Sequence, residues 1–135
     1  MHKQTITLKN SATESDKLSE NLHYFIHSNN ISPDIHDDLR LAIEEIFINI
    51  ISYAYPVDKT YDITIEFSHT VSSLNITFTD SGTAFNPLSC TTCKDDLCDG
   101  GMGIPLIKSL TDEQGYKRVK QHNVFTVTKH YTKQK

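Results

Sequence analysis

The segment from Pro33 to Ala54 constrains the fold of this 135-residue chain more than any other. Its apolar residues recur at intervals of three and four, which predicts an amphipathic helix with one side buried in a core. That side carries Leu39, Ile43, Ile46, Phe47, Ile50 and Ala54. Ser32 is a suitable N-cap and Pro33 suits the first helical position. Pro56 cannot donate a backbone hydrogen bond and therefore ends the helix.

Two strands follow this helix and predict a sheet that is covered on one side only. Apolar residues alternate with polar ones at Ile63, Ile65 and Phe67 in the first strand and at Leu74, Ile76 and Phe78 in the second. Residues 68–73 form a short connection, so we expect an antiparallel hairpin. The polar positions are rich in Thr and Glu, as expected when helices cover one face of a sheet.

The remaining segments complete an α+β fold in a single domain, residues 1–135. We expect a short strand at Thr5–Leu8, a helix at about Ser11–Ser28, a helix at Ile104–Leu110, and closing strands near Gln114–Val119 and Asn123–Tyr131. Residues 82–103 hold four of the five glycines and all three cysteines, without sustained periodicity. Long loops of this kind in compact domains are often functional lids.

Composition narrows the class of protein. A content of 37% hydrophobic and 22% charged residues is that of a soluble globular domain. The formal net charge of −4 provides no broad basic field, which argues against nucleic-acid binding. The longest apolar run, Leu39 to Ala54, includes Arg40 and Glu44 and so does not predict a membrane span. Three cysteines without a signal-peptide pattern favour reduced thiols and a cytoplasmic location.

Glu45 and Asn49 are the first candidate functional residues. They lie four residues apart and therefore face the same way from a mostly apolar helix. Polar groups in such a setting need partners. The Asn49 amide oxygen is a suitable ligand for hydrated Mg²⁺, and a carboxylate beside it could polarise a hydroxyl or a water. The same pair also fits a solvent-facing polar strip on a surface helix.

The second candidate is Asp80-Ser81-Gly82-Thr83-Ala84, which ends the second strand of the hairpin. Residues of this kind commonly just turn the chain. In a functional interpretation, the Asp80 carboxylate accepts a hydrogen bond from an exocyclic amine such as adenine N6. Gly82 would let the base approach the backbone.

The third candidate is Gly100-Gly101-Met102-Gly103, directly before the expected Ile104–Leu110 helix. Glycines allow unusual backbone conformations, and amides at a helix N-terminus attract phosphate. Neither Gly-x-x-x-x-Gly-Lys nor a complete Gly-x-Gly-x-x-Gly is present, so the standard P-loop and dinucleotide sites are excluded. A flexible hinge is the alternative interpretation.

Cys90, Cys93 and Cys98 occupy the same long loop. Three thiolates at this spacing could bind zinc, but no histidine between His69 and His122 supplies a fourth ligand. A reactive or regulatory thiol pair and incidental loop cysteines are the alternatives.

In combination, these segments resemble the ATPase domain shared by gyrase B, MutL and the histidine kinases, known as the GHKL or Bergerat fold. Residues 41–55 resemble the N box of that family, residues 80–88 its first glycine box, and residues 100–110 its second. The closing hairpin is matched by Asp112, Tyr116, Arg118, Asn123, Val124 and Phe125. Within the family, the chain is most similar to the stand-alone bacterial anti-sigma-factor serine kinases.

The resemblance implies a two-layer α/β sandwich with a mixed, mostly antiparallel sheet and helices on one face. A lid at about residues 83–102 would close over ATP. Glu45 would be the general base that activates a serine hydroxyl or a water, and Asn49 would hold the Mg²⁺ that bridges the phosphates. Asp80 would bind the adenine amino group. The implied nucleotide-binding residues are Asn49, Asp80, Gly82, Ala84, Gly101, Met102 and Gly103.

The implied function is that of a serine/threonine protein kinase that uses ATP and Mg²⁺. It would phosphorylate an anti-sigma factor antagonist and reversibly bind a sigma factor or similar client, in the cytoplasm and with a homodimer as one possible assembly. The chain departs from the family pattern directly before Gly100. Family members often place a basic or other charged residue there, near the terminal phosphate, whereas Asp99 would repel phosphate. Two alternatives stay open. One is a non-catalytic module in which nucleotide changes the affinity for a partner, and the other is a small metal-binding interaction domain.

Overall fold

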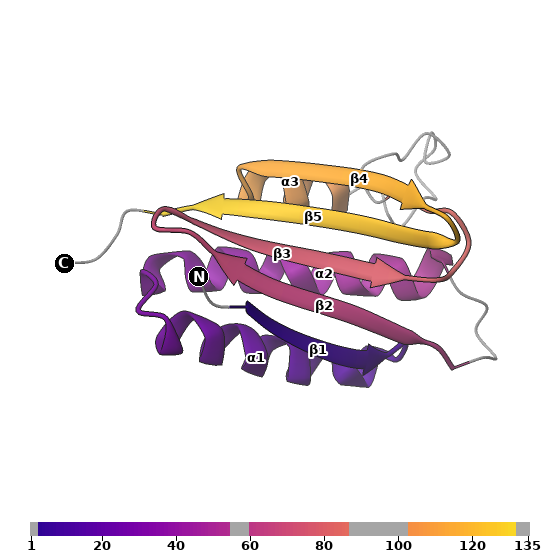
Figure 1. The fold of residues 1–135 in the computed structure, drawn as a ribbon, viewed down its shortest axis with the longest axis horizontal. Coiled ribbons are helices and arrows are strands. Elements are labelled where there is room, and N and C mark those ends of the chain that lie inside the picture. The colour runs from indigo at the N-terminus through magenta and orange to yellow at the C-terminus, as the bar shows by residue number, and fades with distance from the viewer. Residues whose placement is uncertain (1–2, 55–59, 87–102, 132–135) are drawn as a thin grey trace.

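The chain folds into two layers, with a five-stranded sheet on one side and helices on the other (Figure 1). The computed structural model describes residues 3–54, 60–86 and 103–131. The elements in chain order are β1 (Lys3–Lys9), α1 (Ser15–Ser28), α2 (His36–Ala54), β2 (Asp62–His69), β3 (Ser73–Asp80), α3 (Gly103–Leu110), β4 (Glu113–Val119) and β5 (His122–His130). Each lies where the sequence predicted a helix or strand, which confirms the α+β fold class.

The sheet has the strand order β1-β2-β3-β5-β4, and every neighbouring pair is antiparallel. The expectation of a mixed sheet is therefore wrong for the described residues. The physical reason lies in the connection from β3 through α3 to β4. This crossover makes β4 run in the same direction as β3, but β5 lies between them and pairs antiparallel with both. Strands β3 and β4 therefore run parallel to each other, but they do not pair with each other.

Short 3₁₀ turns with serine N-caps precede α1 and α2. A short 3₁₀ turn, Pro33–Ile35, precedes α2, and the Ser32 hydroxyl accepts a hydrogen bond from the Asp34 amide at 3.4 Å, as the sequence predicted. A similar turn, Ala12–Glu14, precedes α1. There the Glu14 carboxylate accepts a hydrogen bond from the Lys9 amide, which lowers the Glu14 pKa, and Lys17 lowers this pKa further.

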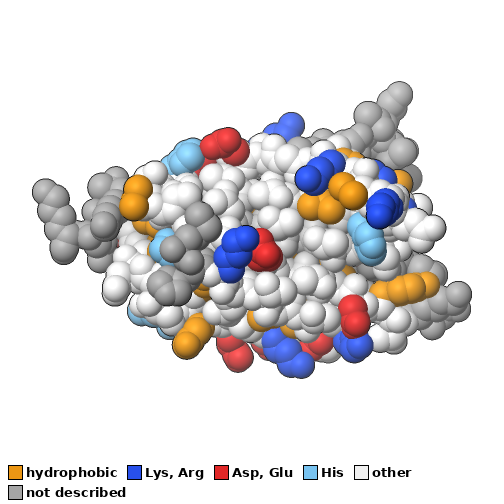
Figure 2. Space-filling model, in the orientation of Figure 1, with side chains coloured by type: hydrophobic (Ala, Val, Ile, Leu, Met, Phe, Trp, Pro, Cys, Tyr) orange, Lys and Arg blue, Asp and Glu red, His pale blue; other side chains and the backbone are white. Residues whose placement is uncertain are grey.

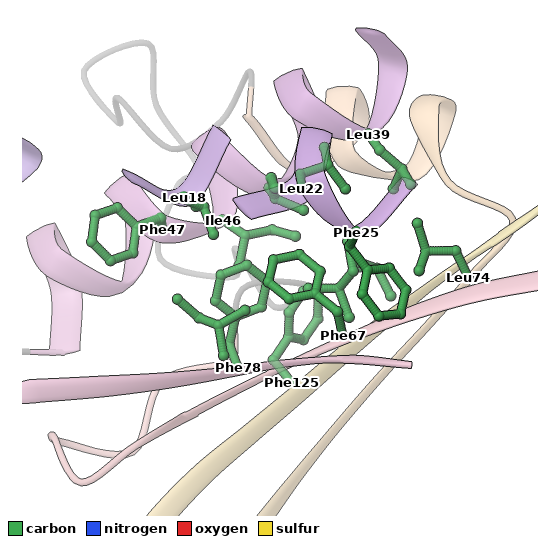
Figure 3. Packing of buried hydrophobic residues seen from close by; sticks show 14 of the residues in the cluster. Leu18, Leu22, Phe25, Leu39, Ile46, Phe47, Phe67, Leu74, Phe78 and Phe125 are labelled. Atoms are coloured by element: carbon green, nitrogen blue, oxygen red, sulfur yellow. The ribbon is translucent and has the colours of Figure 1, made fainter. Parts of the chain in front are cut away.

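The core lies between the two layers and is dominated by aliphatic and phenylalanine side chains (Figure 3). Phe25 of α1 stacks on Phe67 of β2 with 5.7 Å between ring centroids. Alternation along each strand delivers apolar side chains to the helix-covered face, since neighbouring residues point to opposite sides. The fully buried strand residues include Ile63, Ile65, Phe67, Leu74, Ile76, Phe78 and Val127.

The other face of the sheet is not covered by helices. In Figure 2 most of this face is white, which marks backbone and side chains that are neither charged nor hydrophobic, and charged groups are scattered over it. Hydrogen bonds link some of these polar side chains across strands, including Thr77 with Thr126 at 3.0 Å and Thr128 with Asn75 at 2.6 Å. Among the described residues, no helix is both long and apolar enough to cross a membrane.

The buried Phe67 ring generates a stability prediction. Phe67→Ala should lower the free energy of unfolding by about 3–5 kcal/mol, because it removes an aromatic side chain from a site that is 0% exposed. Urea unfolding measures this difference. Val71→Ala is the control, since Val71 is 71% exposed and its truncation should change the free energy by less than about 0.5 kcal/mol. Equal effects of the two substitutions would contradict the described core.

Candidate nucleotide-binding site

The core face of the sheet becomes polar at one end. The apolar row of β3 ends in Asp80, which continues the positions of Ile76 and Phe78, and the row of β5 begins with Asn123, two positions before Phe125. Asp80 and Asn123 are register partners in neighbouring strands, and their exposed fractions are 3% and 2%. The C-terminal end of α2 lies at this same end of the molecule (Figure 1).

Asp80 is held by two donors on one oxygen. Its Oδ1 accepts hydrogen bonds from the Gly82 backbone amide and from Asn123 Nδ2, both at 2.9 Å. The Gly82 bond is the local turn that the sequence allowed, so Asp80 does shape the chain here. No hydrogen bond to Asp80 Oδ2 from another described residue is present. A carboxylate oxygen without a donor can accept a hydrogen bond from a ligand amine.

Asn123 was not among the predicted site residues, although its segment carried part of the family resemblance. Its Oδ1 accepts hydrogen bonds from Tyr116 Oη at 2.5 Å, Arg118 Nη1 at 3.0 Å and the Phe85 amide at 3.1 Å, and its Nδ2 donates to Asp80 Oδ1 and to the Thr83 carbonyl at 2.8 Å. A sequence signal existed, because Asn123 has the same strand parity as the core residues Phe125 and Val127. An amide side chain on the core-facing side of a strand needs hydrogen-bond partners.

Glu45 and Asn49 lie on α2 beside its buried stripe. Glu44 marks the side of α2 that faces α1, since it accepts a hydrogen bond from Ser19 at 2.6 Å. At about 100° per residue, Asn49 lies on the opposite flank together with Ala42, and α3 packs against α2. Asn49 is 7% exposed, which contradicts the alternative of a solvent-facing strip at this position. Glu45 is half-buried.

The Asn49 side chain makes no hydrogen bond with another described residue, and neither does the Glu45 side chain. An amide in a mostly buried position without a protein partner adds less to stability than an apolar side chain of the same size would. Positions that break a packing rule in this way are often functional sites. The pair is therefore available for a ligand.

Of the candidate residues in the two glycine-rich segments, Gly82, Ala84 and Gly103 lie in the described part of the chain. Gly103 is the first residue of α3, and Gly82 carries the amide bonded to Asp80, whereas Ala84 is exposed on the segment that follows. Arg118 Nη1 donates to the Gly82 carbonyl at 2.9 Å.

Several sequence predictions lie outside the described residues: Gly101, Met102, Asp99, the three cysteines and the lid beyond residue 86. Within the described ranges, no group of three or more His, Cys, Asp or Glu side chains is arranged to bind a metal ion.

Comparison with known protein families identifies the family of this domain. A model of the histidine kinase-like ATPase domain matches residues 11–129. This chain belongs to that family. Membership confirms the GHKL fold and implies that the site uses ATP. Of the predicted site residues, Asp80 and Gly82 lie at the polar end of the sheet, and Asn49 lies in the C-terminal half of α2.

Curated relatives with similar sequences are serine-protein kinases. Serine-protein kinase RsbW of Bacillus licheniformis is 32% identical over 86 residues, covering 57% of this chain and 54% of the kinase. RsbW of Bacillus subtilis strain 168 is 30% identical over an alignment of 100 residues, covering 67% of this chain and 61% of the kinase. The chain thus matches between half and two thirds of the length of these relatives.

Solved structures show the same fold at lower sequence identity. A crystal structure of the RsbU and RsbW domains of Rv1364c from Mycobacterium tuberculosis matches 96% of this chain and 32% of its own, with a TM-score of 0.69 at 14% identity. A histidine kinase domain from Erythrobacter litoralis EL346 matches 87% of this chain and 59% of its own, with a TM-score of 0.56 at 12% identity. These likenesses support the fold alone.

The unpartnered amide of Asn49 generates a second stability prediction. Asn49→Leu should leave the free energy of unfolding unchanged or raise it by about 1 kcal/mol, because a similar apolar volume replaces a buried polar group. Thermal and urea unfolding of the nucleotide-free protein measure the change. The reverse exchange, Ile50→Asn, is the control and should destabilise by about 2 kcal/mol or more. A loss above about 1 kcal/mol in Asn49→Leu would show that the amide is needed for folding.

Proposed function

We propose that this chain is a single ATP- and Mg²⁺-binding domain, residues 1–135, which acts as an anti-sigma-type serine/threonine protein kinase in the cytoplasm. It phosphorylates an anti-sigma factor antagonist and reversibly binds a sigma factor or similar client. The observation that carries the proposal is a buried carboxylate, Asp80, with one oxygen held by two donors and the other oxygen available. Family membership and the RsbW relatives support the same assignment.

Asp80 supplies the base-recognition part of this function. Its available Oδ2 accepts a hydrogen bond from the adenine amino group, and Gly82 and Ala84 lie on the segment beside it. The Asp80 carboxylate presents only acceptors, so a base with a carbonyl at the same position, such as guanine or hypoxanthine, is disfavoured. This gives the site a preference for adenine nucleotides.

Asn49 and Glu45 supply the phosphate chemistry. The Asn49 amide oxygen would hold the Mg²⁺ that neutralises the phosphates, with the backbone of Gly101, Met102 and Gly103 beside them. Glu45 would accept the proton of the attacking serine hydroxyl. Positioning and charge neutralisation supply most of the catalysis of phosphoryl transfer, and these groups would provide both.

A non-catalytic module of the same fold is the second candidate. The observation that favours it is Asp99 directly before Gly100, because a carboxylate near the phosphates opposes the build-up of negative charge. In that case ATP would bind and change the affinity for a partner protein without transfer of phosphate.

The roles of Asp80 can be tested through base specificity. In Asp80→Asn, the Asn oxygen is expected to keep the two donors now on Oδ1, so the NH₂ group takes the place of Oδ2. ATP affinity should fall by about 10–100-fold, since a donor then faces the adenine amine. ITP, which has a carbonyl at this position, should lose less affinity. Calorimetric titration of both nucleotides measures the ATP-to-ITP ratio, and an unchanged ratio would contradict base recognition by Asp80.

Catalysis can be separated from binding at Glu45. Glu45→Gln should keep ATP affinity within about three-fold and lower the rate of phosphate transfer by about 10²–10⁴-fold, because the general base is lost. Radiolabelled ATP and purified antagonist proteins from the same genome measure the transfer. Glu44→Gln is the matched control, since Glu44 faces α1 through Ser19. Tight ATP binding by the parent without transfer to any antagonist would favour the non-catalytic module.

A further inference from the structure

Asn123 lies at the centre of the hydrogen-bond network that surrounds Asp80. Resting on the proposed function, we infer that Asn123 is a positioning residue for nucleotide recognition. It fixes the Asp80 carboxylate and the segment after β3, so the affinity of the site for adenine depends on the β4–β5 hairpin. Asn123 itself has no free group to offer to a ligand, as its bonding shows.

The hydrogen-bonding capacity of Asn123 is fully used within the protein. A side-chain amide has two N–H donors and one carbonyl oxygen. The two donors go to Asp80 Oδ1 at 2.9 Å and to the Thr83 carbonyl at 2.8 Å. The oxygen accepts from a phenol, a guanidinium and a backbone amide. Rotation of the amide by 180° would set donors against donors, so this side chain has one stable orientation.

This bonding orients the Asp80 carboxylate. One of its oxygens is shared by the Asn123 amide and the Gly82 backbone, and therefore the direction of the other oxygen is set before a nucleotide arrives. The same network holds the backbone of the base-binding segment, through the Thr83 carbonyl, the Phe85 amide and the bond from Arg118 to the Gly82 carbonyl. A site that is ordered before binding loses less conformational freedom when its ligand binds.

The position requires a neutral amide. Asp80 on one side needs a donor, whereas Tyr116 and Arg118 on the other side need an acceptor. An amide satisfies both sides at once. A second carboxylate at position 123 would satisfy Tyr116 and Arg118 but would face Asp80 as a like charge. An apolar residue would leave buried polar groups on both sides without partners.

The decisive variant is Asn123→Asp, with ATP affinity measured by calorimetric titration from pH 5 to pH 8.5. At pH 8, two carboxylates facing each other should repel and weaken ATP binding by about ten-fold or more relative to the parent at the same pH. At lower pH, one shared proton lets residue 123 donate to Asp80 again, and the affinity ratio should return toward one. Comparison with the parent at each pH removes the contributions of histidines and of ATP itself.

Stability provides a readout that does not need nucleotide. The shared proton raises one carboxyl pKa of the folded variant above its unfolded value, so the stabilisation is present at low pH and is lost as the pH rises through the folded pKa. The unfolding midpoint of Asn123→Asp relative to the parent should therefore fall with rising pH. Asn75→Asp is the matched control, because Asn75 lies on the open face of β3 and bonds Thr128, and its midpoint difference should stay flat over this range.

The outcomes separate the two proposals. If the parent does not bind ATP, the proposed function fails, while a pH-dependent midpoint of Asn123→Asp still supports the network. If the parent binds ATP and Asn123→Asp binds equally well at pH 8, or binds weakly at every pH without recovery, the positioning role is overturned. Should Asn123→Asp not fold above pH 7, Tyr116→Phe removes one donor from the network and should weaken ATP binding about five-fold. Unchanged binding in that variant would also overturn the role.

Discussion

The hydrogen bond between Asn123 Nδ2 and Asp80 Oδ1 joins the ends of the two central strands at the point where the core becomes polar. The base-recognition role proposed for Asp80 depends on this bond. It holds a buried carboxylate in one orientation, and it does so from a strand that is 43 positions away in sequence. Behind it, the apolar rows of both strands are buried in the core.

Helix α2 connects this site to the packing of the whole domain. One side of the helix is buried in the core, the side of Glu44 contacts α1, and Asn49 lies on the flank opposite Glu44. The position of Asn49 therefore follows from the same contacts that stabilise the fold. A partly buried amide on a rigid helix is better positioned for an ion than the same amide on a loop, since its backbone does not need to be ordered on binding.

The elements of the fold could be predicted from periodicity because one-sided burial leaves a direct trace in the sequence. The stripe of α2 and the alternation of β2 and β3 both repeat at the period of their own structure. The sheet pairing was less accessible. The sequence predicted a mixed sheet by resemblance, and the antiparallel order arose because β5 inserts between β3 and β4. Strand order depends on contacts between distant segments, which local periodicity does not record.

Part of the candidate site could also be predicted, because polar residues stand out in an apolar pattern. Asp80 and Asn49 interrupt regular apolar patterns, so their unusual polarity was visible, whereas the bonding of Asn123 was not. By itself, the sequence determined which faces are buried and which polar residues interrupt the core pattern. Only the tertiary structure decided which of those residues meet. Hydrogen bonds form between atoms at about 3 Å, and that proximity comes from strand register rather than from any neighbour along the chain.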